Sequence, residues 1–240
     1  MYILALETTG KYGSAAVIGD NGCPVVVASE NEMNHLQDII TISDAAIKQA
    51  GITKSNLTHI ACSVGPGSFT GIRIGVTTAR TLAQMLGLPC IAVSSLRSLV
   101  KSVENKAKEA DCELILASIN ARRHQTYAAI YNADGSVYAE EKQYMIEEVL
   151  EIAANSGRKV FVTGDGIDAY ADIISEKLNN YELADEKLRY QSAKSVAELA
   201  ITGEYIEASC EYEKLQPNYM RLSEAEQRLA AGTLSSKIHE

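Results

Sequence analysis

Short apolar runs separated by polar, glycine-containing turns mark the first third of the chain as a meander of β-strands. The three runs are rich in aliphatic and β-branched residues and cover residues 2–6, 14–18 and 25–29. Two segments with helical spacing follow, one capped by Asn34 and ending at Gly51, the other ending at Leu86. Apolar runs at residues 59–64 and 90–93 follow the first and the second helix. The predicted order is three strands, helix, strand, helix, strand.

A second, weaker pattern begins near Glu113, without a tandem repeat in the sequence. Its predicted elements are a strand at 114–119, a hairpin at 126–131 and 137–142, a helix at 146–155, a strand at 159–163 and a helix from Ile167. We interpret the polar, lysine-containing helical stretch 94–111 as the link between two lobes. We expect an N-terminal lobe over residues 1–105 and a C-terminal lobe over residues 106–240, whose last helical segment could pack back on the first lobe.

Residues 64–75 are the most informative segment, because a strand, a glycine-rich turn and a helix meet there. In such a junction the N–H groups of the first helical turn can receive an anion or the carbonyl groups of a neighbour. A rigid connector without a ligand is the alternative. Neither phosphate-binding motif fits, since Ile72 and Arg73 follow Gly71 where a P-loop has Lys and Ser or Thr. The dinucleotide motif needs two residues between its second and third glycines, but three separate Gly67 from Gly71.

Composition narrows the cellular setting. The 240 residues are 46% apolar, enough for a substantial core in one large domain or two lobes. Five scattered cysteines without a Cys-x-x-Cys pair favour a reducing cytoplasm over a disulfide or zinc framework. The first apolar run stops at Glu7 without a basic lead, and no run approaches the ~20 residues of a membrane span. We therefore expect a cytoplasmic protein.

The net charge of −9 limits the partners of the chain. A protein that holds nucleic acid alone usually presents a stripe of Lys and Arg, because neutralising phosphates supplies most of the affinity. Here the cations are dispersed, and Arg122-Arg123 is the only adjacent pair of arginines. We expect nucleic acid to be bound only beside a more basic partner.

Candidate catalytic residues are few. Two histidines four residues apart on a helix would present a metal pair on one face. No two of the four histidines have this spacing; they are His35, His59, His124 and His239. Ser68 lies in the glycine-rich turn, but the Gly-x-Ser-x-Gly elbow of hydrolases is missing. We predict no catalytic residue and no metal site.

Four blocks resemble the TsaB family and occur in the order of that family. They are Ile-Leu-Ala-Leu-Glu-Thr-Thr at 3–9, the glycine block at 65–75, Asn120-Ala121-Arg122-Arg123 with Tyr127, and Gln-Pro-Asn-Tyr-Met-Arg at 216–221. The glycine block is shared mainly with the larger relative TsaD. The resemblance implies an α/β, two-lobed actin/sugar-kinase/Hsp70-like (ribonuclease H-like) fold, in which each lobe is a mixed sheet with helices.

The resemblance also implies a function and a set of partners. TsaB is the non-catalytic subunit that TsaD requires to transfer threonylcarbamoyl to the adenosine next to the anticodon of tRNAs reading ANN codons. TsaE, an ATPase, joins the two in a ternary complex, so ATP or ADP is expected in or near the complex rather than as a cofactor of this chain. A homodimer is allowed when the chain is isolated, and tRNA is expected to bind only through the complex. An ATP-dependent small-molecule kinase of the same superfamily is the alternative. A metallopeptidase function is disfavoured by the missing histidine pair.

Two residues depart from the family pattern and weaken a phosphate-chemistry role. The first-strand motif usually has Asp where this chain has Glu7, and the Asp-Ala-Arg motif appears here as Asn120-Ala121-Arg122. A hydrogen bond from a loop backbone to Glu7 is the simpler interpretation. The candidates for a nucleotide site, an anion site or a structural loop are Glu7, Thr8, Thr9, Gly65, Pro66, Gly67, Ser68, Phe69, Thr70 and Gly71.

Helical periodicity leaves apolar residues outside the predicted core faces. On the first helix the predicted core arc is Leu36, Ile39, Ile40, Ala46, Ile47 and Ala50. The second helix is apolar on two sides, which indicates either burial between layers or a partner surface. The resemblance favours a partner, since the family pairs through these two helices. The predicted interface is His35, Asp38, Ile42, Ala45, Arg73, Ile74, Thr77, Thr78, Arg80, Thr81 and Met85.

Overall fold

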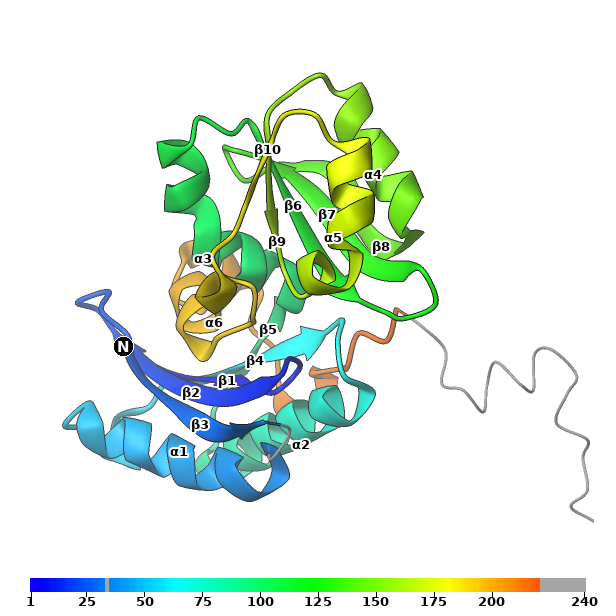
Figure 1. Ribbon diagram of the computed structural model, residues 1–240. Helices are drawn as coiled ribbons and strands as arrows, with labels where there is room; N and C mark the ends of the chain where they lie inside the picture. Colours follow the sequence, from blue (N-terminus) through cyan, green and yellow to red (C-terminus); the bar gives the residue numbers. More distant parts are fainter. Residues whose placement is uncertain (33–34, 221–240) are drawn as a thin grey trace, which may run out of the picture.

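Two lobes, each built on a five-stranded mixed sheet, make up the protein (Figure 1). The computed structural model describes residues 1–32 and 35–220. The strands of the first lobe are β1 (Tyr2–Glu7), β2 (Tyr12–Gly19), β3 (Val25–Glu32), β4 (His59–Gly65) and β5 (Cys90–Ser94). Their order in the sheet is β3-β2-β1-β4-β5, with β1 antiparallel to β2 and parallel to β4. The predicted fold class is confirmed.

Helices cover both faces of the first sheet (Figure 1). On one face lie α1 (His35–Gln49) and α2 (Phe69–Leu86), and on the other, between the lobes, lies α6 (Ala193–Ala200). Leu4 and Leu6 enter the core beneath α1 and α2, whereas Ile3 and Ala5 enter the core beneath α6. Because both faces are covered, β1 is continuously apolar instead of alternating.

The second lobe repeats the topology of the first. Its strands are β6 (Leu114–Asn120), β7 (Gln125–Asn132), β8 (Val137–Met145), β9 (Val160–Thr163) and β10 (Tyr181–Leu183). They are ordered β8-β7-β6-β9-β10, the same arrangement as in the first lobe, with the helices α4 (Ile146–Asn155) and α5 (Gly166–Lys177) in the matching places. The inner helix of this lobe, α3 (Ser95–Glu109), packs on β6 and on α6. Both lobes are therefore βββαβαβ units.

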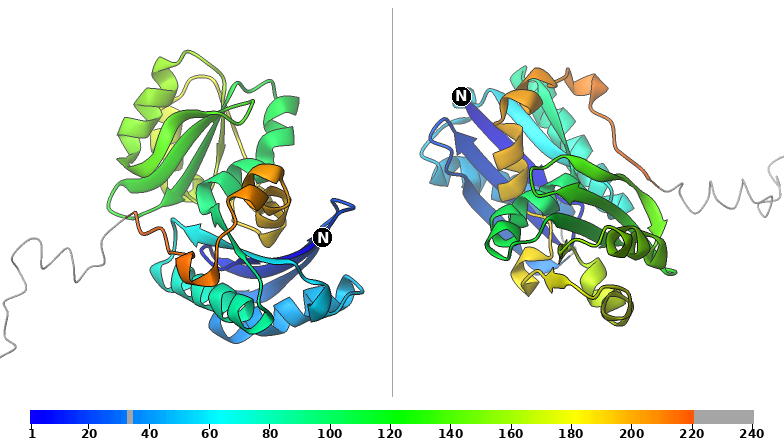
Figure 2. Two further views of the ribbon diagram at one scale, coloured as in Figure 1. Left: turned by 180° about the vertical axis from the view of Figure 1, so that it is seen from behind. Right: turned by 90° about the horizontal axis from the view of Figure 1, so that it is seen from above.

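The end of the described chain returns to the first lobe (Figure 2). After α6 come α7 (Gly203–Glu207) and the 3-10 turn η3 (Tyr212–Lys214), which lies beside α2. Two further 3-10 turns of the described residues are η1 (Lys54–Asn56) and η2 (Glu186–Leu188). Cys210 pairs with the edge strand β5, its N–H donating to the carbonyl of Cys90 at 2.9 Å and its carbonyl accepting from the Cys90 N–H at 2.7 Å. The returning segment thus covers an otherwise open sheet edge.

Two sequence-based interpretations need correction. The stretch 94–111 does join the two lobes as the helix α3, but it is amphipathic and not simply polar, because Leu96, Leu99 and Val103 are buried in the core of the second lobe. The core arc predicted for α1 is rotated from the observed one, since Leu36 is 74% exposed and Ile40 is 55% exposed.

The buried stripe of α1 consists of Ile39, Ile42, Ser43, Ala46 and Ile47, a regular three-and-four spacing. The Ser43 hydroxyl donates to the carbonyl of Ile39 at 2.6 Å, which satisfies a polar group inside the stripe. Ile42, predicted to face a partner, is therefore a core residue. The predicted Asn34 cap and the side chain of His35 lie outside the described residues. No helix in the described parts of the chain is long and apolar enough to cross a membrane.

Candidate functional site

A cleft of about 1070 Å³ opens between the two lobes. The glycine turn after β4 and the hairpin turn after β1 line one wall, and the β6–β7 turn and the start of α5 line the other. Residues 218–220 of the returning segment complete the lining. Five of the ten predicted loop residues line this cleft, namely Thr9, Pro66, Gly67, Ser68 and Phe69. The other five are not among its lining residues: Glu7, Thr8, Gly65, Thr70 and Gly71.

The glycines of the turn leave room for the backbone that follows β1. A Cβ at Gly71 would lie 2.0 Å from the Thr8 carbonyl oxygen, and one at Gly67 would lie 2.6 Å from the Thr9 carbonyl oxygen. The Ser68 N–H donates to the Thr9 carbonyl at 2.9 Å, and the Thr8 hydroxyl donates to the Gly71 carbonyl at 2.7 Å. The two loops therefore pack as one unit, as a rigid connector would.

Ser68 serves as the N-cap of α2. Its hydroxyl oxygen accepts from the Gly71 N–H at 3.2 Å, which satisfies one of the first N–H groups of the helix. A capping role accounts for this serine without nucleophilic chemistry.

Glu7 is fully buried and bonded inside the first lobe. Its Oε1 accepts from the Thr9 N–H at 2.5 Å and from the Thr9 hydroxyl at 2.7 Å, and its Oε2 accepts from the Ser63 hydroxyl. Thr9 in turn shares a hydrogen bond of 2.9 Å with the hydroxyl of Ser95 at the start of α3. Burial raises the pKa of Glu7, opposed by these hydrogen bonds. The carboxylate holds the β1–β2 turn in place.

Asn120 occupies the place of Glu7 in the second lobe, at the end of the first strand. Its Oδ1 accepts from the Arg122 N–H at 2.8 Å and from the Tyr170 hydroxyl at 3.1 Å, while its own N–H donates to Asp165 at 2.8 Å. Burial raises the pKa of Asp165, and the nearby Asp168 raises it further. An amide accepts the same hydrogen bonds as a carboxylate without adding a negative charge beside Asp165, which explains Asn at this position.

Aromatic and cationic side chains stack at the edge of the cleft. The Phe69 and Tyr219 rings lie 4.9 Å apart, and the Arg73 guanidinium lies 4.2 Å from the centre of the Phe69 ring. Arg73 Nε also donates to the Tyr219 hydroxyl at 3.1 Å. Below them the Asn218 N–H donates to the Val64 carbonyl at 2.7 Å, at the end of β4. Arg73, predicted to face a partner, thus makes contacts within the chain.

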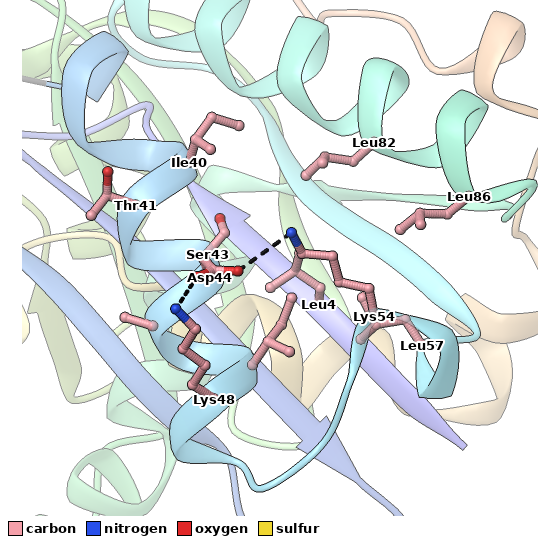
Figure 3. Close-up of a pocket in the computed structure, with 12 residues that line it drawn as sticks. Leu4, Ile40, Thr41, Ser43, Asp44, Lys48, Lys54, Leu57, Leu82 and Leu86 are labelled. Carbon is pink, nitrogen blue, oxygen red and sulfur yellow. Dashed lines mark ion pairs between the residues drawn. The ribbon is translucent and has the colours of Figure 1, made fainter.

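A second hollow, an apolar groove of about 530 Å³, lies between α1 and α2 (Figure 3). Ile40 from α1 and Leu82 and Leu86 from α2 line it, with Leu57 at its floor. At its edge Asp44 pairs with Lys48 at 2.6 Å and with Lys54 at 3.3 Å, and these two cations lower the pKa of Asp44.

The second apolar face of α2 is not covered by the described chain. Met85 is 77% exposed and Thr81 is exposed, which excludes burial between layers for this end of the helix. Of the remaining predicted interface residues on α2, Thr77 is exposed, and Ile74, Thr78 and Arg80 are half-buried. On α1, Ala45 lines the groove, and Asp38 accepts from the Ser29 hydroxyl at 2.5 Å.

Sequence reasoning missed several residues of the cleft, notably Asp165, Asp168 and Tyr190. They come from the start of α5 and from the loop before α6, whose chemistry gives no local signal in the sequence. Within the described residues, no group of three or more His, Cys, Asp or Glu side chains could hold a metal ion.

Comparisons with known proteins agree with the motif-based resemblance. Residues 26–229 match the family model described as TsaD, tRNA N6-adenosine threonylcarbamoyltransferase. The chain is 28% identical to the tRNA threonylcarbamoyladenosine biosynthesis protein TsaB of Bacillus subtilis, covering 94% of this chain and 96% of that protein. It is 39% identical over 110 residues to a tRNA N6-adenosine threonylcarbamoyltransferase of Lacticaseibacillus casei, covering 39% of this chain and 32% of that protein.

Among solved structures, YeaZ from Pseudomonas aeruginosa has the same fold, with a TM-score of 0.77 and 24% identity over 91% of this chain and 99% of that one. The match to the TsaB protein of Bacillus subtilis confirms the resemblance to TsaB proteins over nearly the whole chain.

Proposed function

Because the chain belongs to the family of TsaD, the tRNA N6-adenosine threonylcarbamoyltransferases, we propose that it serves threonylcarbamoyladenosine formation as the partner subunit of a TsaD protein. The TsaB protein that matches nearly the whole chain is named for threonylcarbamoyladenosine biosynthesis in tRNA, which supports the pathway. The observation that carries the partner role is the uncovered apolar surface of α1 and α2. The modified base would be the adenosine beside the anticodon of tRNAs that read ANN codons.

The cleft supports a subunit without transfer chemistry of its own. Glu7, the carboxylate at the end of β1, is buried and bonded to Thr9 and Ser63. Ser68 is used as a helix cap. Both groups stabilise the loop unit and leave no activated nucleophile or base at the glycine turn.

The helix surface has the chemistry of a protein interface. Ile40 is an exposed apolar side chain and lines the groove together with Leu82 and Leu86. Leu36 and Met85 are further exposed large apolar side chains on the same two helices. A continuous apolar hollow with a charged edge is typical of a protein–protein contact.

A TsaD protein is a natural occupant, because it is related to this chain. Two related lobes can place the same pair of helices face to face around an approximate two-fold axis. A second copy of this chain could use the same face when no TsaD is present. TsaE, and any ATP or ADP, would enter only with the assembled complex.

The alternative, a small-molecule kinase, has a distinct signature. A kinase of this fold must bind ATP with magnesium in the cleft of the isolated chain. Isothermal titration of the purified chain with both would then give saturable heat, whereas the partner role predicts none. The kinase alternative is kept only if that heat is observed.

Met85→Asp tests the partner role directly. A charge without a counter-ion in a packed interface costs several kcal/mol, and about 4 kcal/mol weakens pairing roughly a thousandfold. Co-purification with the TsaD of the same organism, followed by a tRNA modification assay, should show loss of both pairing and activity. The matched control is Met145→Asp, because Met145 is also an exposed methionine but lies at the end of β8 in the other lobe.

Thermal melting separates an interface effect from unfolding, since Met85 makes little contact with the core. Modified tRNA formed by TsaD without this chain would contradict the proposal. If the wild type and Met85→Asp pair equally well with TsaD, the interface must lie on another surface of the protein.

A further inference from the structure

The turn between β6 and β7 has an unusual backbone. Three successive residues, Arg122, Arg123 and His124, have φ values of 62, 54 and 59°. Residues other than glycine rarely adopt this left-handed region, and Gly or Asn would do so at lower cost. Backbone strain of this kind is found where side chains have a specific task. Three large side chains at these positions therefore indicate that the turn holds them in place for contact with a binding partner.

Hydrogen bonds hold the turn in a fixed shape. The Ala121 N–H donates to the Gln125 carbonyl at 2.9 Å, and the Gln125 N–H donates to the Arg122 carbonyl at 2.9 Å. The Tyr170 hydroxyl donates to the Gln125 carbonyl at 2.9 Å, and the Ile146 N–H donates to the His124 carbonyl at 3.0 Å. The side chains of Arg122, Arg123 and His124 are nevertheless exposed. A rigid base with exposed cations is pre-organised for an anionic partner.

The charges around the cleft favour an anion, although the whole chain carries −9. Lys11, Arg122 and Arg123 line the cleft. Of the two lining carboxylates, Asp168 pairs with Arg189 at 2.5 Å, and the half-buried Asp165 accepts from the Asn120 N–H at 2.8 Å. The mouth of the cleft is thus positive in a negative molecule.

The opposite edge of the cleft offers a surface for planar groups. Phe69 and Tyr219 are each 38% exposed, and Arg73 stacks on Phe69. Aromatic rings and guanidinium planes are the surfaces on which unpaired bases of single-stranded RNA stack, and flanking cations bind its phosphates.

We infer that the mouth of this cleft binds single-stranded RNA, the anticodon loop of the tRNA substrate, with phosphates on Arg122 and Arg123 and a base on the Phe69–Tyr219 stack. The inference rests on the proposed function. A few phosphate contacts on an acidic protein give little affinity alone. The contact therefore matters once a TsaD protein supplies the rest of the binding surface.

The test uses the complex with TsaD and the double variant Arg122→Asn, Arg123→Asn. Asn accepts the left-handed backbone, so the variant should melt at the wild-type temperature or above it. Pairing with TsaD should be unchanged. Affinity for an unmodified transcript of an ANN-reading tRNA should fall roughly tenfold, and the slope of log K against log salt should become shallower by about 1.4, since each single-strand contact contributes ~0.7.

The matched control removes two cations elsewhere, with Lys106→Gln and Lys108→Gln on the last turn of α3. It should leave both the affinity and the salt slope unchanged. A second variant, Tyr219→Leu, should lower affinity without changing the slope, because it removes a stacking surface and no charge.

Unchanged RNA affinity and slope in the arginine variant would overturn the inference, as would an equal loss in the lysine control. Displacement of the transcript by ATP with magnesium would identify a nucleotide site instead and would also overturn it. Failure of the wild-type chain to pair with TsaD, or tRNA modification that does not need it, would remove the proposed function itself. Normal pairing and activity with arginine-independent RNA binding would remove only the present inference.

Discussion

The two lobes have the same topology but use the turn after their first strand in opposite ways. In the first lobe Glu7 turns inward, bonds Thr9 and Ser63, and fixes a turn that packs against the glycine loop. In the second lobe Asn120 bonds the base of its turn, and Arg122 and Arg123 extend outward. The turn of the first lobe is therefore packed inside the protein, while the turn of the second lobe exposes two positively charged side chains. Topology thus determines where a turn lies, and the side chains determine whether it is closed or offered to a partner.

The largest expected change in unfolding free energy comes from glycine substitutions, which test whether the strand-to-helix connections of the two lobes are equally tightly packed. A Cβ at Gly71 in the first lobe would lie 2.0 Å from the Thr8 carbonyl oxygen, and one at Gly164 in the second would lie 2.0 Å from the Ser118 carbonyl oxygen. Both obstacles are backbone atoms, so Gly71→Ala and Gly164→Ala should each cost about 3 kcal/mol of unfolding free energy. Urea denaturation measures the loss.

Gly203→Ala is the matched control, because no atom outside its chain neighbours and its own helix backbone lies within 4 Å of the Cβ that it adds. It should leave the unfolding free energy nearly unchanged. Stability of Gly71→Ala equal to that of this control would mean that the first connection is loose, and the two lobes would then differ in rigidity as well as in charge.

A smaller effect is expected when the second lobe is given a carboxylate like that of the first. Asn120→Asp places a negative charge beside Asp165, whose pKa is already raised by burial and by Asp168. Like charges at short range should destabilise the variant by about 1–2 kcal/mol at neutral pH. Protonation of the pair should restore stability as the pH falls, and thermal melting at several pH values measures it.

The double variant Asn120→Asp, Asp165→Asn separates repulsion from lost hydrogen bonding. It keeps one carboxylate at the site and should recover most of the neutral-pH loss if repulsion is the cause. No recovery would show that the Asn120 amide itself is required.

The smallest effect concerns the pH dependence of Glu7. Burial raises its pKa above the ordinary value of a glutamate side chain, so the folded protein binds this proton more readily than the unfolded chain does. Stability from this group is therefore complete below the unfolded pKa and declines as the pH rises through the folded pKa. Glu7→Gln removes the slope, and its cost should be larger at about pH 4 than at about pH 8. Equal costs at the two pH values would contradict a raised pKa.

Much of this fold can be predicted from the sequence, because the signals are local. Ile3 to Leu6 is continuously apolar and is a strand buried on both faces. The inner face of α3 was missed because Leu96, Leu99 and Val103 are spaced among serines and lysines, and the polar residues dominated the interpretation. The exposure of Leu36 and Ile40 depends on how α1 is rotated on the sheet, which no local pattern fixes.

The candidate site was less predictable for a related reason. The glycine turn is visible in the sequence, but the purpose of its glycines depends on Thr8 and Thr9, about sixty residues earlier. The bond between Asn120 and Asp165 joins residues 45 apart. Such contacts exist only after the sheets have formed. Propensity and spacing could therefore identify the loops but not the residues that contact them.

The position of α6 bears on how the protein is made. This helix closes the inner face of the first sheet, against Ile3 and Ala5, although it lies near residue 200. During synthesis the first five strands leave the ribosome long before Val196 and Ala197 are available to cover them. The sheet face that α6 covers therefore stays exposed in the nascent first lobe until the second lobe has been translated. Delayed closure of this kind makes the two lobes one folding unit and favours a chain that engages chaperones early.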